Sequence, residues 1–383
     1  MAVDHEDDSM NVVRVLLVDD SVVIRRMLTD ALATDPEIEV VATSSNGRLA
    51  LQRLAIDVPD VVVMDIEMPE LNGLETLPHL RKLYPKLPVI MFSTLTTSGG
   101  KATLEALALG ASDYVAKPAN MGSIAATMER IRADLIPKIK ALGGRGPDVV
   151  TSVPQRPIAG PRVAPAPLVR RQPPTLSARV DAVVIGVSTG GPNALQAIIP
   201  KLPADLAVPL FVVQHMPKLF TRLLAERLDG LSLVTVAEAQ PGIVAQSGTV
   251  LIAPGDFHMT LVRRDGRVEV ALDSEPPENS CRPSVDPLFR SAAQIYGSGT
   301  LAVVLTGMGK DGLAGVETVT AAGGQCFAQD EATSVVWGMP GFVTRAGLAD
   351  CNLGLDGIAT ELVRRCSHGR NHVIAHSGVK VGR

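Results

Sequence analysis

Residues 180–195 read VDAVVIGVSTGGPNAL and open the second half of the chain. Residues 182–187 form an apolar, β-branched run of the kind found in a buried strand. A glycine-rich turn follows at once, and the residues after it favour a helix. Strand, tight turn and helix in this order are typical of an α/β fold. They place Ser188 at the carboxyl end of a strand, where such folds bind their ligands.

The turn around Ser188 has two chemical interpretations. A glycine-rich turn can bind a phosphate with its backbone amides, or it can present a serine as a nucleophile. Residues 186–190, GVSTG, fit the nucleophile pattern G-x-S-x-G. A Walker loop needs a lysine that is missing here, and Ser188 occupies a glycine position of the dinucleotide fingerprint. The pattern therefore favours a nucleophile, while an ordinary turn or helix-cap serine remains the alternative.

A serine nucleophile needs a base within hydrogen-bond reach and a carboxylate to orient that base. Of the seven histidines, only His215 and His258 lie in the body of the second half. His215 follows the apolar run PLFVVQ and so arrives at a strand end, as Ser188 does. His258 lies in a turn before another strand, which suits structural bonding or a substrate contact. We predict that His215 is the base.

Asp311 is the predicted orienting carboxylate. Residues 300–316, TLAVVLTGMGKDGLAGV, predict an apolar strand, a glycine-rich turn and a helix, and Asp311 lies in the turn. Asp311 can also be read as a helix N-cap. Three other aspartates compete but need a different geometry: Asp256, Asp286 and Asp330. The chain order Ser, His, Asp differs from the Ser, Asp, His of α/β-hydrolases, which predicts a separate Rossmann-like hydrolase.

The first half of the chain alternates β-rich runs with helical patterns, which predicts a second doubly wound parallel sheet. The carboxyl ends of its strands carry Asp19, Asp20, Asp65, Ser93 and Lys117. Three carboxylates brought together repel one another unless a hard cation lies among them, and Mg²⁺ prefers such oxygen ligands. The lysine can balance the charge of a phosphoryl group on one carboxylate. This edge is therefore a predicted phosphorylation site.

Residues 141–178 are rich in proline and contain no aromatic residue. Such a segment cannot bury enough apolar surface to order itself. We predict a linker here, between a first domain over residues 12–135 and a second over residues 179–367. Residues 368–383 predict a flexible tail. Three histidines in it have the spacing of a metal-binding face of a helix: His368, His372 and His376. A glycine interrupts this spacing, so we favour a flexible tail over a metal site.

The composition of the 383-residue chain narrows the classes of function. Aromatic residues make up 3% and the net charge is −4, so the chain lacks the stacking platforms and basic surface of a nucleic-acid-binding protein. No apolar run approaches the roughly 18 residues of a membrane span, and the acidic N-terminus is no signal peptide. The four cysteines are expected to be reduced and mostly buried. We expect a cytoplasmic protein with no nucleic-acid partner and no membrane insertion.

Four segments of the first half closely resemble the receiver domain of two-component response regulators: LLVDDS, VMDIEMPELNG, MFST and GASDYVAKP. The resemblance implies a (βα)5 fold that a histidine kinase phosphorylates on Asp65. It implies Mg²⁺ at that site, held by Asp19, Asp20 and Asp65 and by the backbone carbonyl of Glu67. The implied switch hydroxyl, rotating aromatic residue and phosphate-binding lysine are Ser93, Tyr114 and Lys117.

Five segments of the second half resemble the catalytic domain of chemotaxis protein-glutamate methylesterases, the CheB family: IGVSTGGPNAL, VVQHMP, RPSVDPLFRSAA, LTGMGKDGLAGV and AQDEATSVVWGMP. The resemblance covers roughly residues 180–365. It implies that Ser188 is the nucleophile, His215 the base and Asp311 its orienting carboxylate. Thr189 and the turn at Met308 are the implied neighbours that supply backbone donors to the oxyanion.

The resemblance implies hydrolysis of glutamate γ-methyl esters on chemoreceptors with release of methanol, and deamidation of receptor glutamines through the same acyl intermediate. The esterase chemistry is expected to need no cofactor, and the protein is expected to be a monomer. Residues 218–221, KLFT, depart from the family's Pro-Gly-Phe-Thr near the expected substrate cleft. We predict that the unphosphorylated receiver covers the Ser188 cleft. The rival interpretation is a non-enzymatic signalling module.

Overall fold

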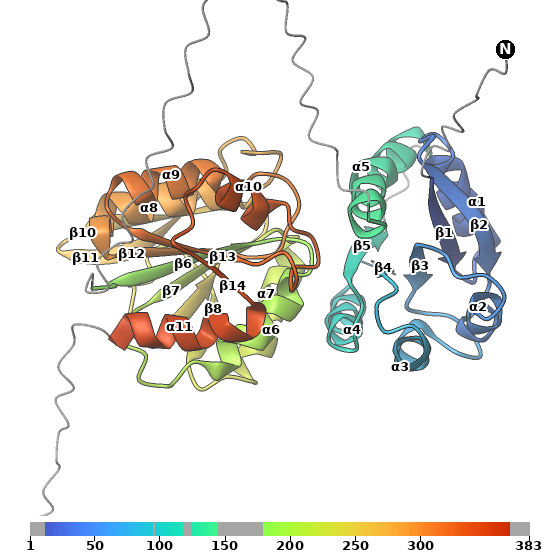
Figure 1. Ribbon diagram of the computed structural model, residues 1–383, viewed down its shortest axis with the longest axis horizontal. Helices are drawn as coiled ribbons and strands as arrows, with labels where there is room; N and C mark the ends of the chain where they lie inside the picture. The colour runs from blue at the N-terminus through green and yellow to red at the C-terminus, as the bar shows by residue number, and fades with distance from the viewer. Residues whose placement is uncertain (1–11, 95, 118–123, 145–178, 368–383) are drawn as a thin grey trace, which may run out of the picture.

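Two parallel sheets, each flanked by helices, form most of the part of the chain that the computed structural model describes (Figure 1). The described residues are 12–94, 96–117, 124–144 and 179–367. This arrangement confirms the predicted pair of doubly wound α/β domains. Residues 145–178 of the linker predicted over residues 141–178 lie outside the described residues, as do the histidines of the tail, so those predictions stay predictions.

The first domain is a five-stranded parallel sheet in the order β2-β1-β3-β4-β5. Its core forms on both faces of the sheet, with α1 and α5 against one face and α2, α3 and α4 against the other. Helix α5 continues to Leu142, beyond the domain end predicted at residue 135, and includes the first two residues of the predicted linker. The elements are β1 (Val13–Val18), α1 (Val22–Leu32), β2 (Ile38–Ser44), α2 (Gly47–Leu54), β3 (Val61–Asp65), α3 (Gly73–Leu83), β4 (Val89–Thr94), α4 (Thr97–Ala108), β5 (Asp113–Lys117) and α5 (Ile124–Leu142).

The second domain is a seven-stranded parallel sheet in the order β14-β13-β12-β6-β7-β9-β8. Helices α6, α7 and α11 pack on one face, and α8, α9 and α10 on the other, as Figure 1 shows for α11 and for α8 to α10. The elements are β6 (Ala182–Val187), α6 (Gly191–Ile198), η1 (Ile199–Lys201), β7 (Leu210–Gln214), α7 (Lys218–Asp229), β8 (Thr235–Glu238), β9 (Thr249–Ile252), β10 (His258–Arg264), β11 (Arg267–Asp273), α8 (Val285–Tyr296), η2 (Gly297–Gly299), β12 (Thr300–Val304), α9 (Leu313–Ala321), β13 (Gln325–Gln329), α10 (Met339–Arg345), β14 (Cys351–Leu353) and α11 (Leu355–Ser367).

One pair of strands departs from simple strand–helix alternation. Strands β10 and β11 form a separate antiparallel hairpin that packs against α8. Asp265 and Gly266 connect them, and both have positive φ angles, 47° and 78°. A two-residue Asp-Gly turn of this kind matches the twist of a hairpin, which is why RVEVAL pairs back on its predecessor instead of joining the parallel sheet.

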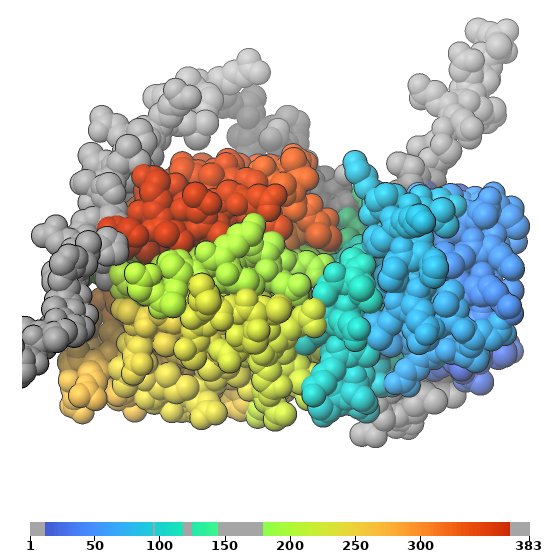
Figure 2. Space-filling view, turned by 90° about the horizontal axis from the view of Figure 1, so that it is seen from below, coloured from blue at the N-terminus to red at the C-terminus, as the bar shows by residue number. Residues whose placement is uncertain are grey.

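The two domains meet through α4 and β5 of the first and α6 and α7 of the second. The ring of Tyr114 stacks on Phe220 with centroids 4.7 Å apart. Asn193 Nδ2 donates a hydrogen bond to the carbonyl of Ala111 at 3.2 Å. Figure 2 shows the turquoise surface of the first domain, which includes α4, against the lime-to-yellow surface of the second. None of the described helices combines the length and the apolar character that a membrane crossing requires.

Candidate active site and phosphorylation site

Adjacent strands bring Ser188 and His215 to the same edge of the second sheet. Val187 on β6 is in register with Gln214 on β7, and the next residue on each strand is Ser188 or His215. The amide of His215 donates to the carbonyl of Val187 at 3.2 Å, which extends the pairing to these positions. Because neighbouring strands lie about 4.8 Å apart, the two predicted catalytic residues start side by side.

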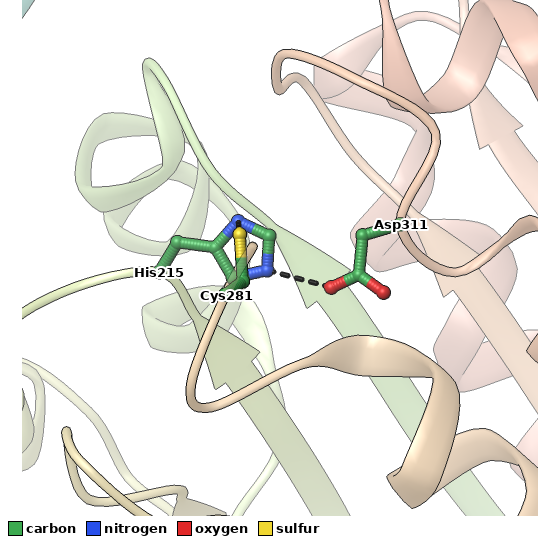
Figure 3. A group of neighbouring side chains, drawn as sticks. All are labelled: His215, Cys281 and Asp311. Carbon is green, nitrogen blue, oxygen red and sulfur yellow. Dashed lines mark hydrogen bonds and ion pairs between the residues drawn. The ribbon is translucent and has the colours of Figure 1, made fainter. Parts of the chain in front are cut away.

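His215 and Asp311 are in direct contact. His215 Nε2 lies 2.8 Å from Asp311 Oδ2 (Figure 3). Strand β12 lies on the other side of β6, and the turn after β12 carries Asp311 to the same edge. Only 2% of the Asp311 side chain is exposed. Further donors hold the carboxylate in place: Ser284 Oγ at 2.7 Å, Val285 N at 2.7 Å, Asn279 Nδ2 at 2.9 Å and Gly312 N at 3.0 Å.

These donors keep Asp311 ionised. Burial alone raises the pKa of a carboxyl group, but the hydrogen bonds from His215, Val285 and Ser284 outweigh burial and lower the pKa of Asp311 to about 2. For His215, burial acts to lower the pKa, and the contacts with Asp311 and Cys281 outweigh it and raise the pKa from 6.5 to about 9. At neutral pH the two side chains are therefore an imidazolium–carboxylate pair.

This ion pair also makes the fold sensitive to pH. Because folding raises the pKa of His215, its protonation stabilises the folded state. This contribution to the free energy of unfolding is fully present below pH 6.5 and is lost as the pH rises through about 9. Because folding lowers the pKa of Asp311, its ionisation also stabilises the folded state. This contribution is fully present above pH 3.8 and is lost as the pH falls through about 2.

Ser188 is held by its backbone. Its amide donates to the carbonyl of Thr306 at 3.0 Å, and its carbonyl accepts from Gln214 Nε2 at 3.0 Å. Gly307 lies so close that a Cβ there would be 2.7 Å from Ser188 Cβ, so this position needs a glycine. Within the described part of the chain, Ser188 Oγ has no hydrogen-bond partner. The structure thus places Ser188 beside His215 without pairing Oγ to the ring.

The predicted oxyanion residues flank Ser188. Thr189 follows it directly, and Met308 follows Gly307, which packs on Ser188. Among the described residues, neither the amide of Thr189 nor that of Met308 has a hydrogen-bond acceptor. Thr189 is buried and Met308 is partly buried, and a buried amide seldom lacks a partner in native structures. Two unpaired amides beside a candidate nucleophile therefore fit an oxyanion site.

The competing residues from the sequence do not reach His215. Asp286 is buried nearby and accepts hydrogen bonds from Gly315 N at 2.6 Å and Asn279 Nδ2 at 2.8 Å. Burial raises its pKa to about 6. Asp256 lies in a turn with φ 70°, and Asp330 bonds to Thr333. His258 is a structural residue, since both its ring nitrogens bond to backbone groups, the amide of Ser284 and the carbonyl of Pro276.

Sequence reasoning missed two residues of this site. Cys281, one of four cysteines expected to be reduced and mostly buried, places Sγ 3.5 Å from His215 Nδ1. Asn279, with φ 52°, bridges Asp311 and Asp286 through Nδ2. Both precede the segment RPSVDPLFRSAA, and this proximity to a family motif is the only signal in the sequence that marks them.

The predicted phosphorylation site assembles at the carboxyl edge of the first sheet. Lys117 Nζ lies 2.8 Å from Asp65 Oδ2 and 3.0 Å from Asp19 Oδ2. Burial raises the pKa of Asp65, although the contact with Lys117 opposes that shift. Carboxylate oxygens of Asp19, Asp20 and Asp65 lie within 4.8 Å of one another, a spacing and a donor set that fit Mg²⁺.

Of the predicted switch residues, Lys117 contacts Asp65, whereas among the described residues no hydrogen bond joins Ser93 or Tyr114 to Asp65. Ser93 Oγ donates to the carbonyl of Gly99 at 3.2 Å and accepts from Thr103 Oγ1 at 2.7 Å. Tyr114 is buried against Phe220 of the second domain. Glu67 is exposed in the loop after β3, and its predicted backbone contact with a metal stays a prediction.

The first domain is a receiver-type sheet, and the second is a Rossmann-like domain that carries serine, histidine and aspartate at its strand ends. Together they define a response regulator with an enzymatic output domain. Family models match both halves: the response regulator receiver domain over residues 15–129 and CheB methylesterase over residues 183–362. The chain belongs to the CheB methylesterase family.

Two relatives support this membership over nearly the whole chain. A "Protein-glutamate methylesterase/protein-glutamine glutaminase" of Nocardioides sp. is 50% identical over 370 residues, which cover 94% of this chain and 98% of the relative. A relative of the same name from Trichodesmium erythraeum is 47% identical, with 92% and 98% covered. The crystal structure of the Thermotoga maritima CheB methylesterase catalytic domain matches at 48% identity and a TM-score of 0.48, covering 48% of this chain and 98% of that one.

Proposed function

We propose that this chain is a phosphorylation-controlled protein-glutamate methylesterase that hydrolyses glutamate γ-methyl esters on chemoreceptors and also deamidates receptor glutamines. The observation that carries the proposal is the 2.8 Å contact between His215 and Asp311 at the strand edge that also carries Ser188. Family membership and the names of the relatives support the choice of substrate. A cytoplasmic location and a monomeric state belong to the same proposal.

The geometry suggests how the residues divide the reaction. Asp311 bonds to Nε2 of His215, so we assign the proton of Ser188 to the other ring nitrogen, Nδ1, which in this structure lies 3.5 Å from Cys281 Sγ. Ser188 Oγ then attacks the ester carbonyl, and the amides of Thr189 and Met308 bind the oxyanion. Protonated His215 returns the proton to the departing methoxide, which leaves as methanol. A water molecule, deprotonated by His215, then attacks the acyl-enzyme. Ser188 Oγ leaves and takes the proton back from His215, which gives a free glutamate.

The same steps support deamidation. With a glutamine side chain, the tetrahedral intermediate expels ammonia instead of methanol and gives the same acyl-enzyme. We propose no cofactor for either reaction, because the serine, the histidine and the two amides supply the nucleophile, the proton transfers and the oxyanion donors.

The receiver site fits a phosphoryl switch. Asp65 would accept the phosphoryl group from a histidine kinase, and Lys117 would bind one of its oxygens. Asp19, Asp20 and Asp65, with the carbonyl of Glu67, would hold Mg²⁺, which supplies positive charge beside the phosphoryl oxygens. Phosphorylation of Asp65 would draw Lys117 away from Asp19 and change the surroundings of Tyr114, which packs on the second domain.

The esterase should become faster as the pH rises. His215 can act as a base only when it is neutral, and its raised pKa keeps it protonated below about pH 9. We expect kcat/KM for methanol release to increase from pH 6.5 to about pH 9. In Cys281→Ala one of the contacts that raise this pKa is missing, so the increase should come at lower pH. A pH–rate profile of both proteins checks this, and a flat profile would contradict His215 as the base.

Removing the receiver should release the esterase. Its contacts fall on α6 and α7, which begin at Gly191 and Lys218, three residues after Ser188 and His215 respectively. Deleting residues 1–175 is expected to raise methanol release above that of the unphosphorylated full chain by about 5- to 150-fold, the usual range of allosteric coupling. Full-length Asp65→Asn with phosphodonor is the control and should stay slow. A truncated protein no faster than the full chain would refute inhibition by the receiver.

A further inference from the structure

His215, Cys281 and Asp311 together form a mixed set of metal-binding atoms. One nitrogen, one sulfur and one oxygen from these side chains lie within 4.8 Å of one another. Figure 3 shows Cys281 against the ring of His215 and Asp311 on the side of Nε2. The esterase reaction uses His215 and Asp311 but assigns no step to the thiol. We propose that the three residues bind a divalent cation of the Zn²⁺ type, and that this ion switches the esterase off.

The donor atoms are held in place before any ion arrives. Cys281 closes a tight turn with Glu278, since the amide of each donates to the carbonyl of the other at 2.9 and 3.2 Å. Arg290 on α8 anchors this turn through two hydrogen bonds to the Glu278 carboxylate, at 2.6 and 2.7 Å. Five other donors already bond to the Asp311 carboxylate, namely the four given above and the amide of Asp286 at 3.4 Å. Binding therefore requires little ordering of the protein, which favours affinity.

The chemistry of the set selects the ion. Thiolate, imidazole and carboxylate are the usual ligands of Zn²⁺, and three protein ligands with a water in the fourth position form a common Zn²⁺ site. Mg²⁺ prefers oxygen ligands alone. The all-oxygen cluster of Asp19, Asp20 and Asp65 in the receiver thus suits Mg²⁺, and the cluster at Cys281 suits the softer ion.

The site is open to ions from solvent. The His215 side chain is 13% exposed, and Cys281 is also partly exposed. Because hydrogen bonds already occupy both oxygens of Asp311, we assign most of the affinity to Cys281 and His215. Binding replaces the proton of the Cys281 thiol and one ring proton of His215; both protons pass to solvent, and the ion takes the lone pairs that they leave. Since His215 then has no free nitrogen for the proton of Ser188, hydrolysis stops; this inhibitory half rests on the proposed function.

Cd²⁺ tests the site directly, because a Cd²⁺–thiolate bond has an ultraviolet charge-transfer absorption. The full-length protein, with saturating Mg²⁺ to fill the receiver site, is titrated with Cd²⁺ and then with Zn²⁺. We expect one equivalent of Cd²⁺–thiolate absorption that Zn²⁺ competes away. The band should disappear in Cys281→Ser and remain in Cys351→Ser, a matched control because Cys351 is also partly exposed but lies on β14. A band that persists in Cys281→Ser, or is missing from the parent protein, overturns the site.

Inhibition is measured separately, as the ratio of methanol release with and without Zn²⁺ for each protein. We expect Zn²⁺ to inhibit the parent protein, a chelator to restore it, and Cys281→Ser to need at least about tenfold more Zn²⁺, since even outer partners of a metal site change affinity by that factor. Cd²⁺ bound at Cys281 without inhibition by Zn²⁺ overturns the inhibitory role. An inactive parent protein that still shows the Cd²⁺ band contradicts the proposed function and leaves the metal site supported.

Discussion

Ser188→Ala should lower methanol release from a methylated receptor by about 10⁴- to 10⁶-fold, the range seen when the nucleophile of a serine hydrolase is removed. Without Oγ no acyl-enzyme forms, and the amides of Thr189 and Met308 can only stabilise direct attack by water. The backbone contacts of Ser188 with Thr306 and Gln214 do not involve its hydroxyl, so the fold should remain intact. Single-turnover release of methanol in the presence of a phosphodonor measures the effect.

Ser247→Ala is a matched control for this substitution. Ser247 belongs to the same domain, is exposed, and uses its hydroxyl only to donate to the carbonyl of Ala207 at 2.8 Å. It lies before β9, at the edge of the sheet opposite Ser188. This variant should release methanol at the parental rate. Equal release by Ser188→Ala and the parent protein would rule out the triad and favour a non-enzymatic output domain.

Asp311→Asn should lower the rate by about 10³- to 10⁴-fold, as loss of the orienting carboxylate does in serine hydrolases. The amide keeps the shape of the side chain but loses the charge that holds His215 in its working tautomer. The pKa of His215 should fall, because its contact with Asp311 is one of the causes that raise it. The rise of kcat/KM with pH should therefore come at lower pH than in the parent protein.

The same substitution also weakens the fold, and a second variant separates the two effects. The amide nitrogen that Asp311→Asn introduces cannot accept the hydrogen bonds that Ser284 or Val285 donates, and an unsatisfied buried donor costs about 1–3 kcal/mol. Asp286→Asn disturbs the neighbouring buried carboxylate, which bonds to Gly315 and not to His215. Denaturant unfolding should show a loss of stability in both variants, whereas only Asp311→Asn should show the large loss of rate. Similar rates in the two would contradict the role of Asp311.

The sequence predicted both strand-edge sites because a parallel sheet has a simple rule. In such a sheet the carboxyl ends of all strands meet at one edge, so residues that follow apolar runs become neighbours in space. This rule alone brings Lys117 to Asp65, and His215 to Ser188 and Asp311. The Asp-Gly turn at residues 265–266 was an equally readable signal for the β10–β11 hairpin, and it outweighs the alternation of strands and helices there.

Alternating apolar runs, strand-end chemistry and family motifs were thus enough to predict the two α/β domains and to propose the phosphorylation site and the triad. Only the three-dimensional fold shows that Asn279 contacts Asp311 and that Cys281 contacts His215, because both come from a turn with no periodic sequence pattern. It was also needed for the stacking of Tyr114 on Phe220, which joins two domains. The physical reason is the same in each case: local propensity specifies the strands and their ends, whereas contacts between loops and between domains depend on how the finished elements pack.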